Sequence, residues 1–256
     1  MDNSLPTVYD RKGGASLVFG ENARNLDESV LKNGVNIDAY AAKILMKRGI
    51  DVGVKSCKRT YAMPVEYFCR EDDYTIATAN SDAVYYDMEI DEKAEILSEF
   101  LKIKGSFGNY SEHLWKTADK CPACYFYEND KGQKFLVYAF TAELSWAKGV
   151  WSKGLFRNYY RQAQLNYGIE KLQGRKLPAI CMKNPELYIL CKKDDNSMAV
   201  GLWNFFADGV INPEVILDGK YSKADFYNCT GKLEEDKVIL DDEITPYSFA
   251  FFTVYK

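Results

Sequence analysis

The sequence predicts a mainly β protein: a β-sandwich with one packed helix, preceded by a partial α/β segment. Three observations predict this class. An apolar strand and an alanine-rich helix follow one another within residues 34–49. From about residue 57, short strand-like runs recur between Pro, Gly, Asn and Asp residues, which is typical of a sandwich. One helical pattern, about 156–173, interrupts these runs. We therefore expect an α/β segment over 1–56 and a sandwich-type domain over 57–256.

The opening strand–helix unit has clear boundaries. Gly34–Ile37 is a short apolar strand, and Asp38 is a favourable N-cap for a helix over Ala39–Arg48. Gly49 lies where a glycine commonly ends a helix. Because one strand and one helix cannot bury their own apolar faces, the unit predicts the closing piece of a larger α/β domain that begins upstream.

The remaining elements follow from apolar periodicity and from turn residues. Asn129–Gly132 predicts a hairpin turn. The helix that ends at Gly174 carries apolar residues on both sides, so we expect it to be covered on more than one face. The runs that predict strands are Val65–Cys69, Val84–Ile90, Ala94–Phe100, Ala123–Glu128, Lys134–Phe140, Leu187–Lys193, Met198–Phe206, Glu214–Leu217, Ala224–Asn228, Lys237–Leu240 and Tyr247–Tyr255.

The composition limits the classes of binding partner and the cellular compartment that we expect. Hydrophobic residues make up 47% and charged residues 27%, with a net charge of −4, so we expect neither a nucleic-acid nor a membrane partner. No apolar run is long enough to cross a membrane and no signal peptide is visible. The seven cysteines are irregularly spaced, which favours reduced thiols and a cytoplasmic location.

Two features could carry nucleophilic, redox or metal chemistry, and for both we favour a structural interpretation. Cys121 and Cys124 form a CxxC that precedes a strand, whereas a redox site requires a helix N-terminus and a zinc site requires a second ligand pair. His113 is the sole histidine and lies in a polar stretch, without a nucleophile elbow anywhere in the chain. We expect no metal and, because no phosphate-binding loop occurs, no cofactor.

Carboxylates are numerous enough for a glycosidase pair, which composition alone does not exclude. Such a pair needs two carboxyl groups held about 5–10 Å apart on a rigid scaffold. The barrel that usually provides it takes about 250 residues of alternating strands and helices. That alternation occurs here only in the first fifty residues, so we expect the chain not to be catalytic by itself.

Two tryptophans are candidates for contact with carbohydrate. Trp146 and Trp151 flank a short polar segment before the long helix, where exposed indoles could stack on a sugar ring. The alternative is that they cover the edge of the sandwich. Trp203 lies inside a predicted strand, and we expect it in the core.

Several segments resemble one family. Asn33–Ala42, continuing to Lys47–Ile50, resembles the end of the glutamine-amidotransferase-like domain that follows the catalytic barrel in some bacterial β-galactosidase-like glycoside hydrolases. Later segments are similar to the β-domains of that family: Pro122 with Tyr127–Asn129 and Gly132, Asn158–Arg161, Leu177–Pro178, and Val200–Asn204. The resemblance implies a non-catalytic domain that helps assembly, with the active carboxylates on an upstream barrel. No position here inherits them, and the start of the amidotransferase-like domain is absent.

Together these observations predict a non-catalytic accessory or structural region of a glycoside-hydrolase-like protein. Its expected partners are the upstream barrel, a second copy of the chain, or a carbohydrate. The alternative is a free-standing carbohydrate-binding module that uses Trp146 and Trp151. A third interpretation, a small hydrolase of its own kind, would require turnover by the isolated chain.

Overall fold

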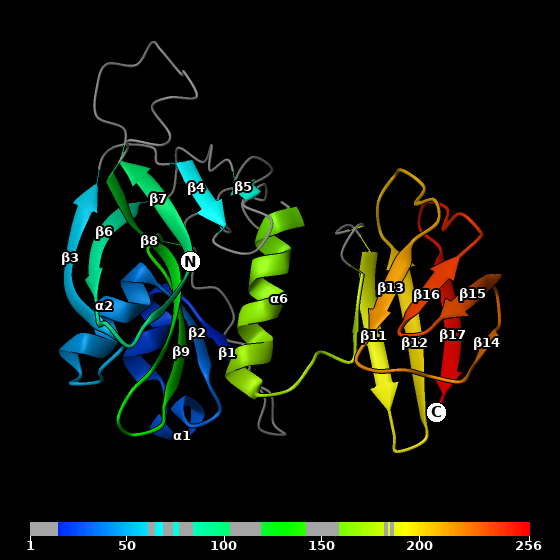
Figure 1. Ribbon diagram of the computed structural model, residues 1–256, viewed down its shortest axis with the longest axis horizontal. Coiled ribbons are helices and arrows are strands. Elements are labelled where there is room, and N and C mark those ends of the chain that lie inside the picture. Colours follow the sequence, from blue (N-terminus) through cyan, green and yellow to red (C-terminus); the bar gives the residue numbers. More distant parts are fainter. Residues whose placement is uncertain are drawn as a thin grey trace, which may run out of the picture. The chain divides into compact units, whose positions relative to one another are not determined.

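The computed structural model describes residues 15–60, 65–68, 74–76, 84–102, 119–141, 159–181, 184 and 187–256. Its contacts divide the chain into two compact units, Met1–Gly174 and Arg175–Lys256 (Figure 1). The described part is mostly strand, and the second unit is a β-sandwich, so the expected fold class is confirmed.

The first unit is built on a seven-stranded mixed sheet with the order β1-β2-β9-β8-β7-β4-β5. Strands β1, β2 and β9 run parallel, and the remaining neighbours are antiparallel. β3 and β6 form a separate antiparallel pair. The strands of this unit are β1 (Ser16–Val18), β2 (Val35–Asp38), β3 (Val54–Thr60), β4 (Val65–Phe68), β5 (Tyr74–Ile76), β6 (Tyr85–Ile90), β7 (Glu95–Lys102), β8 (Asp119–Glu128) and β9 (Lys134–Tyr138).

The predicted strand–helix unit forms as expected. β2 leads into α2 (Ala39–Lys47), whose N-cap is Asp38. The Asp38 carboxylate accepts hydrogen bonds from the backbone N–H of Ala41 at 2.8 Å and of Gly20 at 3.0 Å. Gly49, at a φ of +77°, adopts the left-handed conformation that glycine tolerates best. A 3-10 helix, η1 (Gly20–Asn25), and a short helix, α1 (Glu28–Leu31), connect β1 to β2.

The sheet that this unit needs comes from later in the chain. β2 pairs with β9, about one hundred residues downstream, in the register Ile37↔Val137. The division expected at residue 56 therefore falls inside the first unit, and the contacts separate the units at Gly174 instead. The physical reason is that β2 pairs with β9, a strand that lies in the β-rich part of the sequence.

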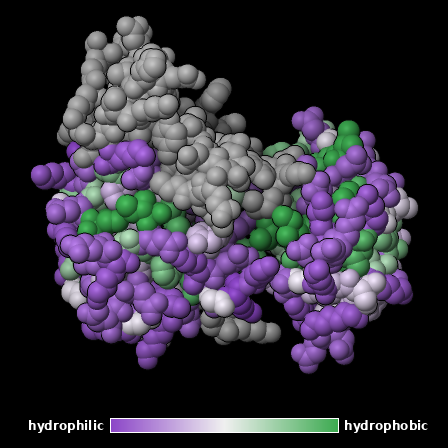
Figure 2. Space-filling view, viewed as in Figure 1, coloured by the Kyte–Doolittle hydropathy of each residue, from purple (hydrophilic) through white to green (hydrophobic). Residues whose placement is uncertain are grey.

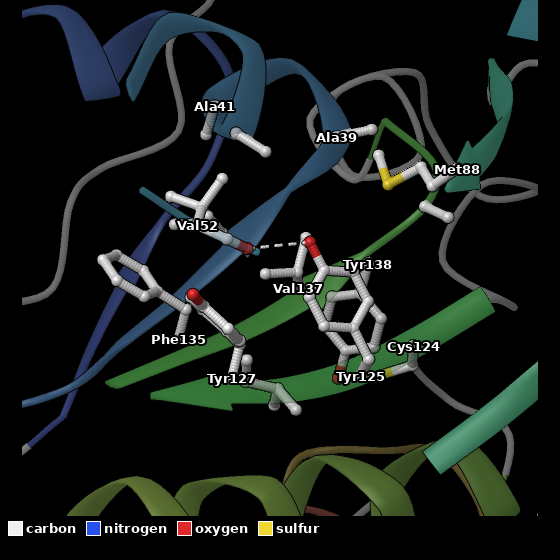
Figure 3. Close-up of a cluster of buried hydrophobic side chains, with 14 of the residues drawn as sticks. Ala39, Ala41, Val52, Met88, Cys124, Tyr125, Tyr127, Phe135, Val137 and Tyr138 are labelled. Carbon is white, nitrogen blue, oxygen red and sulfur yellow. Dashed lines mark hydrogen bonds between the residues drawn. The ribbon is translucent and has the colours of Figure 1, made fainter. Parts of the chain in front are cut away.

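The long helix, α6 (Tyr159–Gln173), belongs to the first unit and matches the expected 156–173 closely. α2 and α6 both contact β2 and β9, and they cover opposite faces of the sheet (Figures 1 and 3). Contact with α6 is close because Gly168 has no side chain: an added Cβ would lie 2.3 Å from a methyl carbon of Leu136. The buried residues of this helix, Gln164, Gly168 and Leu172, form one stripe at i, i+4 spacing.

Aromatic and aliphatic side chains fill the core between α2 and the sheet. Figure 3 shows Tyr125, Phe135 and Val137 of β8 and β9 packed below Ala39 and Ala41 of α2. All five are fully buried. No described helix is long and apolar enough to span a membrane.

The second unit consists of two four-stranded sheets, β10-β13-β16-β15 and β11-β12-β17-β14. All pairings are antiparallel. Apolar residues between the two sheets form one buried cluster. The strands are β10 (Ala179–Ile180), β11 (Leu187–Lys193), β12 (Ser197–Asn204), β13 (Glu214–Leu217), β14 (Lys223–Phe226), β15 (Gly231–Glu234), β16 (Lys237–Leu240) and β17 (Phe249–Tyr255).

Candidate functional site

The sheet β11-β12-β17-β14 has an inner face in the core and an outer face of unusual composition. In β12, alternation places Val200 and Leu202 in the core and directs Gly201 and Trp203 to the outer face. β17 is apolar on both faces: Phe252 is buried, whereas Phe249 is 52% exposed. Hydrophobic residues thus remain on the surface of this unit, where Figure 2 shows green patches among hydrophilic side chains.

Strand register brings three aromatic rings into one row across the outer face. Tyr188 of β11 lies opposite Trp203 of β12, which lies opposite Phe249 of β17. The ring centroids are 6.3 Å apart in both pairs. Cross-strand aromatic neighbours stabilise a sheet by packing on each other, and here that packing takes place at the surface.

A second row continues the apolar surface. Leu190, Gly201 and Phe251 occupy opposing positions in β11, β12 and β17. Tyr227, which follows β14, packs on Phe251 with the ring centroids 5.1 Å apart. The Asn228 side chain fixes this corner by donating to the Phe249 carbonyl at 2.7 Å and accepting from the Phe251 N–H at 2.8 Å.

We define the aromatic face by the residues of these rows together with Phe205, whose ring centroid is 6.1 Å from that of Tyr188. None of its side chains carries a charge at neutral pH. Apolar patches of this kind on a surface mark binding or packing sites. The aromatic face comprises Tyr188, Leu190, Trp203, Phe205, Tyr227, Phe249 and Phe251.

Such a face can bind through stacking and burial, and none of its side chains is a carboxylate, an imidazole, a thiol or an amine. The aromatic rings present π-faces on which an apolar ligand surface can pack. Tyrosine hydroxyls add neutral hydrogen-bonding groups at its margin. These properties suit a ligand with both apolar faces and hydroxyl groups, as a sugar ring has.

Several described carboxylates are held in their charged form by hydrogen bonds. The Arg24 side chain lowers the pKa of Glu21 to about 2. Backbone N–H groups of Ser29 and Asn196 lower the pKa of Asp27 and Asp194, and the Lys232 side chain lowers that of Glu234. A glycosidase acid requires the opposite, a raised carboxyl pKa. Among the described residues, no group of three or more His, Cys, Asp or Glu side chains is placed to hold a metal ion.

The residues singled out in the sequence have different outcomes. Trp146, Trp151 and His113 lie outside the described residues. Cys121 and Cys124 lie within β8, and both are buried.

The expectation for Trp203 was wrong in one respect. It lies in a strand as predicted, but on the outer face and only partly buried, because strand alternation gives it the same side as Gly201. Tyr188 and Phe249 are site residues that the sequence did not indicate. Their strands, β11 and β17, carry apolar residues at both odd and even positions. The sequence therefore does not show which face of each strand lies in the core.

No protein-family model and no curated protein matches this chain. Among solved structures it is similar to the β-galactosidase of Bacillus circulans sp. alkalophilus, with 11% identity and a TM-score of 0.42 over 93% of this chain. It is also similar to Gan42B, a GH42 β-galactosidase of G. stearothermophilus, with 12% identity and a TM-score of 0.39 over 94% of this chain. A third is the cold-adapted β-galactosidase of Rahnella sp. R3, with 12% identity and a TM-score of 0.38 over 94% of this chain. The chain spans 31% of the length of each of these proteins. Identities and TM-scores at this level assign no function to it.

Proposed function

We propose that this chain is a non-catalytic accessory region of a glycoside-hydrolase-like, carbohydrate-processing protein. The observation that carries the proposal is the segment Gly34–Gly49, whose sequence resembles the amidotransferase-like domain of such proteins. It has the strand, capped helix and terminal glycine that the resemblance implies.

The roles of the described carboxylates are consistent with a structural region. Asp38, which is fully buried, caps α2 and holds the start of η1. Glu21 pairs with Arg24, and Asp194 holds the turn before β12. In the proposed arrangement the catalytic carboxylates belong to an upstream barrel. This region completes the upstream domain, shapes the rim of a neighbouring active site or mediates self-association.

Two measurements test the accessory role. The coding sequence upstream of Met1 is expected to continue in frame into a barrel-encoding region, whereas a ribosome-binding site directly before Met1 would contradict the proposal. Purified chain is expected to leave a panel of nitrophenyl glycosides unhydrolysed. Turnover that disappears when one carboxylate is replaced by its amide would identify a hydrolase instead.

A second candidate function, carbohydrate binding, is favoured by the row of Tyr188, Trp203 and Phe249. Aromatic platforms bind flat ligands by stacking, and each ring contributes on the order of 1–3 kcal/mol where bases are the ligand. Titration calorimetry with neutral oligosaccharides should detect binding in the millimolar range or tighter, and Trp203→Ala should abolish it. Binding lost only in Trp151→Ala would instead assign the site to the tryptophan pair expected from the sequence.

A further inference from the structure

The three rings of the central row differ in orientation. The planes of Trp203 and Phe249 lie within 23° of each other, whereas those of Tyr188 and Trp203 cross at 62°. Trp203 and Phe249 are therefore a nearly parallel pair, and Tyr188 stands at an angle beside them. A ligand that packs on one face of each ring of this pair would place two flat units in succession, since each ring stacks on one.

Gly201 determines how the Trp203 indole lies. A Cβ added to Gly201 would be 2.4 Å from Cη2 and 2.5 Å from Cζ3 of that indole, so the six-membered ring leans along its own strand over the glycine. Gly201 does not have a positive φ, and an alanine there needs no strained backbone. The space above Gly201 is thus occupied by an aromatic ring because the residue has no side chain.

The lack of charge in the two rows limits the classes of ligand that the aromatic face can bind. The rows of Tyr188, Trp203 and Phe249 and of Leu190, Gly201 and Phe251 carry no charged side chain. Along β11, the charged residues begin only at Lys192, in the next row. A neutral face with hydroxyl groups at its margin favours a neutral, hydroxyl-rich ligand over a charged peptide, a nucleic acid or a phosphorylated sugar.

We propose that Trp203 and Phe249 form a two-ring floor that binds two consecutive units of a neutral, linear oligosaccharide, with Gly201 as the residue that positions the indole. Tyr188 forms the side of this site. The inference rests on carbohydrate binding as the second candidate function and specifies the ligand's class and minimum length.

The test is titration of the intact chain with matched β-1,4-linked probes: glucose, cellobiose and cellotetraose, and the corresponding mannose and galactose series. For the series that binds, affinity is expected to rise at least tenfold from one unit to two and less than threefold from two to four. In Phe249→Ala the monosaccharide should bind as before, but the gain from the second unit should disappear.

Gly201→Ala should weaken disaccharide binding at least tenfold while the melting temperature stays within a few degrees of the parent. Gly219→Ala is the matched control, because an added Cβ there meets nothing within 4 Å and the backbone φ is not positive. It should change neither binding nor melting. A Gly201→Ala variant that binds as tightly as the parent would overturn the positioning role.

The remaining outcomes separate this inference from the function on which it rests. Equal affinity for one unit and two, with Trp203→Ala still abolishing binding, would overturn the two-ring floor and leave carbohydrate binding intact. No binding of any probe would reject carbohydrate binding by this face and the inference together. Self-association in sedimentation that Phe249→Ala abolishes would show that a second copy covers the face.

Discussion

The hydroxyl of Tyr127 donates a hydrogen bond to the Asp51 carboxylate over 2.6 Å. This contact joins β8 to the turn that leads from α2 into β3. The other carboxylate oxygen of Asp51 accepts from the Gly53 N–H at 2.9 Å, and Tyr125 donates to the Val52 carbonyl at 3.0 Å. Two tyrosines of one central strand therefore fix a turn more than seventy residues earlier in the chain.

Alkaline pH should loosen this turn. Burial and the hydrogen bond to Asp51 raise the pKa of Tyr127 above its ordinary value of 10.0, and burial holds the pKa of Tyr125 well above that value too. In the unfolded chain both hydroxyls ionise near pH 10, while in the folded chain they stay protonated. Their stabilisation is thus complete below about pH 10 and is lost as the pH rises beyond it. Urea unfolding from pH 8 to 11 should show this decline.

Removing single hydroxyls distinguishes the two tyrosines. Tyr125→Phe leaves the buried Val52 carbonyl without its donor and should cost about 1–3 kcal/mol at pH 7. Tyr127→Phe should cost about 1 kcal/mol, because the Asp51 carboxylate is exposed and keeps its bond to Gly53. Each variant should also decline less steeply above pH 10. A Tyr127→Phe variant with the parent's alkaline slope would contradict the assigned role.

Two glycines provide a matched test of the same contact. Gly53 and Gly132 have nearly equal positive φ angles, +76° and +71°. A Cβ on Gly53 would lie 2.6 Å from Cγ of the Tyr127 ring, whereas one on Gly132 meets nothing within 4 Å. Alanine at Gly132 should cost about 1–2 kcal/mol for its left-handed backbone. At Gly53 the cost should be larger by about 1–3 kcal/mol from overpacking. Equal costs in chemical denaturation would show that Tyr127 moves aside freely.

The parts of the fold that the sequence predicted well are those determined by neighbouring residues. Asp38 and Gly49 bound α2 through contacts only a few residues away, so the capping pattern located that helix almost to the residue. The strands β11, β13 and β16 were predicted at their observed bounds because turn residues enclose each apolar run. Polar strands such as β3 were missed, since VKSCKRT shows no clear apolar alternation.

What sequence could not predict is pairing between distant segments. No local pattern indicates that Ile37 lies beside Val137, and that one pairing decides where the first unit ends. The candidate site shows the same limit. Phe249 and Phe252 are equally apolar in sequence, yet the second sheet covers only Phe252. Which of the two alternating sets of residues faces the core depends on the element that packs against the strand.

The Cys191 thiol should react slowly at neutral pH although it is only partly buried. Burial, reinforced by the Asp218 carboxylate, raises its pKa from 9.0 to about 11. At pH 8 its thiolate fraction should be about a hundredfold below that of an ordinary cysteine, since each pKa unit is a tenfold change. Iodoacetamide labelling followed by mass spectrometry should show modification that rises steeply toward pH 11. Asp218→Asn should speed labelling at pH 8, and chain unfolded in urea gives the reference rate for an unhindered thiol.

Asn204 links the two loops beside the aromatic face. Its side-chain amide donates to the carbonyls of Asp208 at 2.7 Å and Ile244 at 3.0 Å, and its oxygen accepts from the Phe206 N–H at 3.0 Å. The side chain is fully buried. Asn204→Asp would place a carboxylate against carbonyl oxygens, and at pH 7 it should cost about 3 kcal/mol or more.

The free energy of unfolding of the Asn204→Asp variant should also depend on pH in a definite direction. Facing carbonyl oxygens in a buried position, the introduced carboxyl group would have a folded-state pKa above its unfolded value of about 3.9. Its protonated form regains a donor, so the deficit relative to the parent should be smallest near pH 4 and grow as the pH rises to 7. Asn228→Asp is the exposed control and should show a smaller cost with little pH dependence. If both variants lost stability equally at pH 7, burial of the Asn204 amide would not be what holds these two loops together.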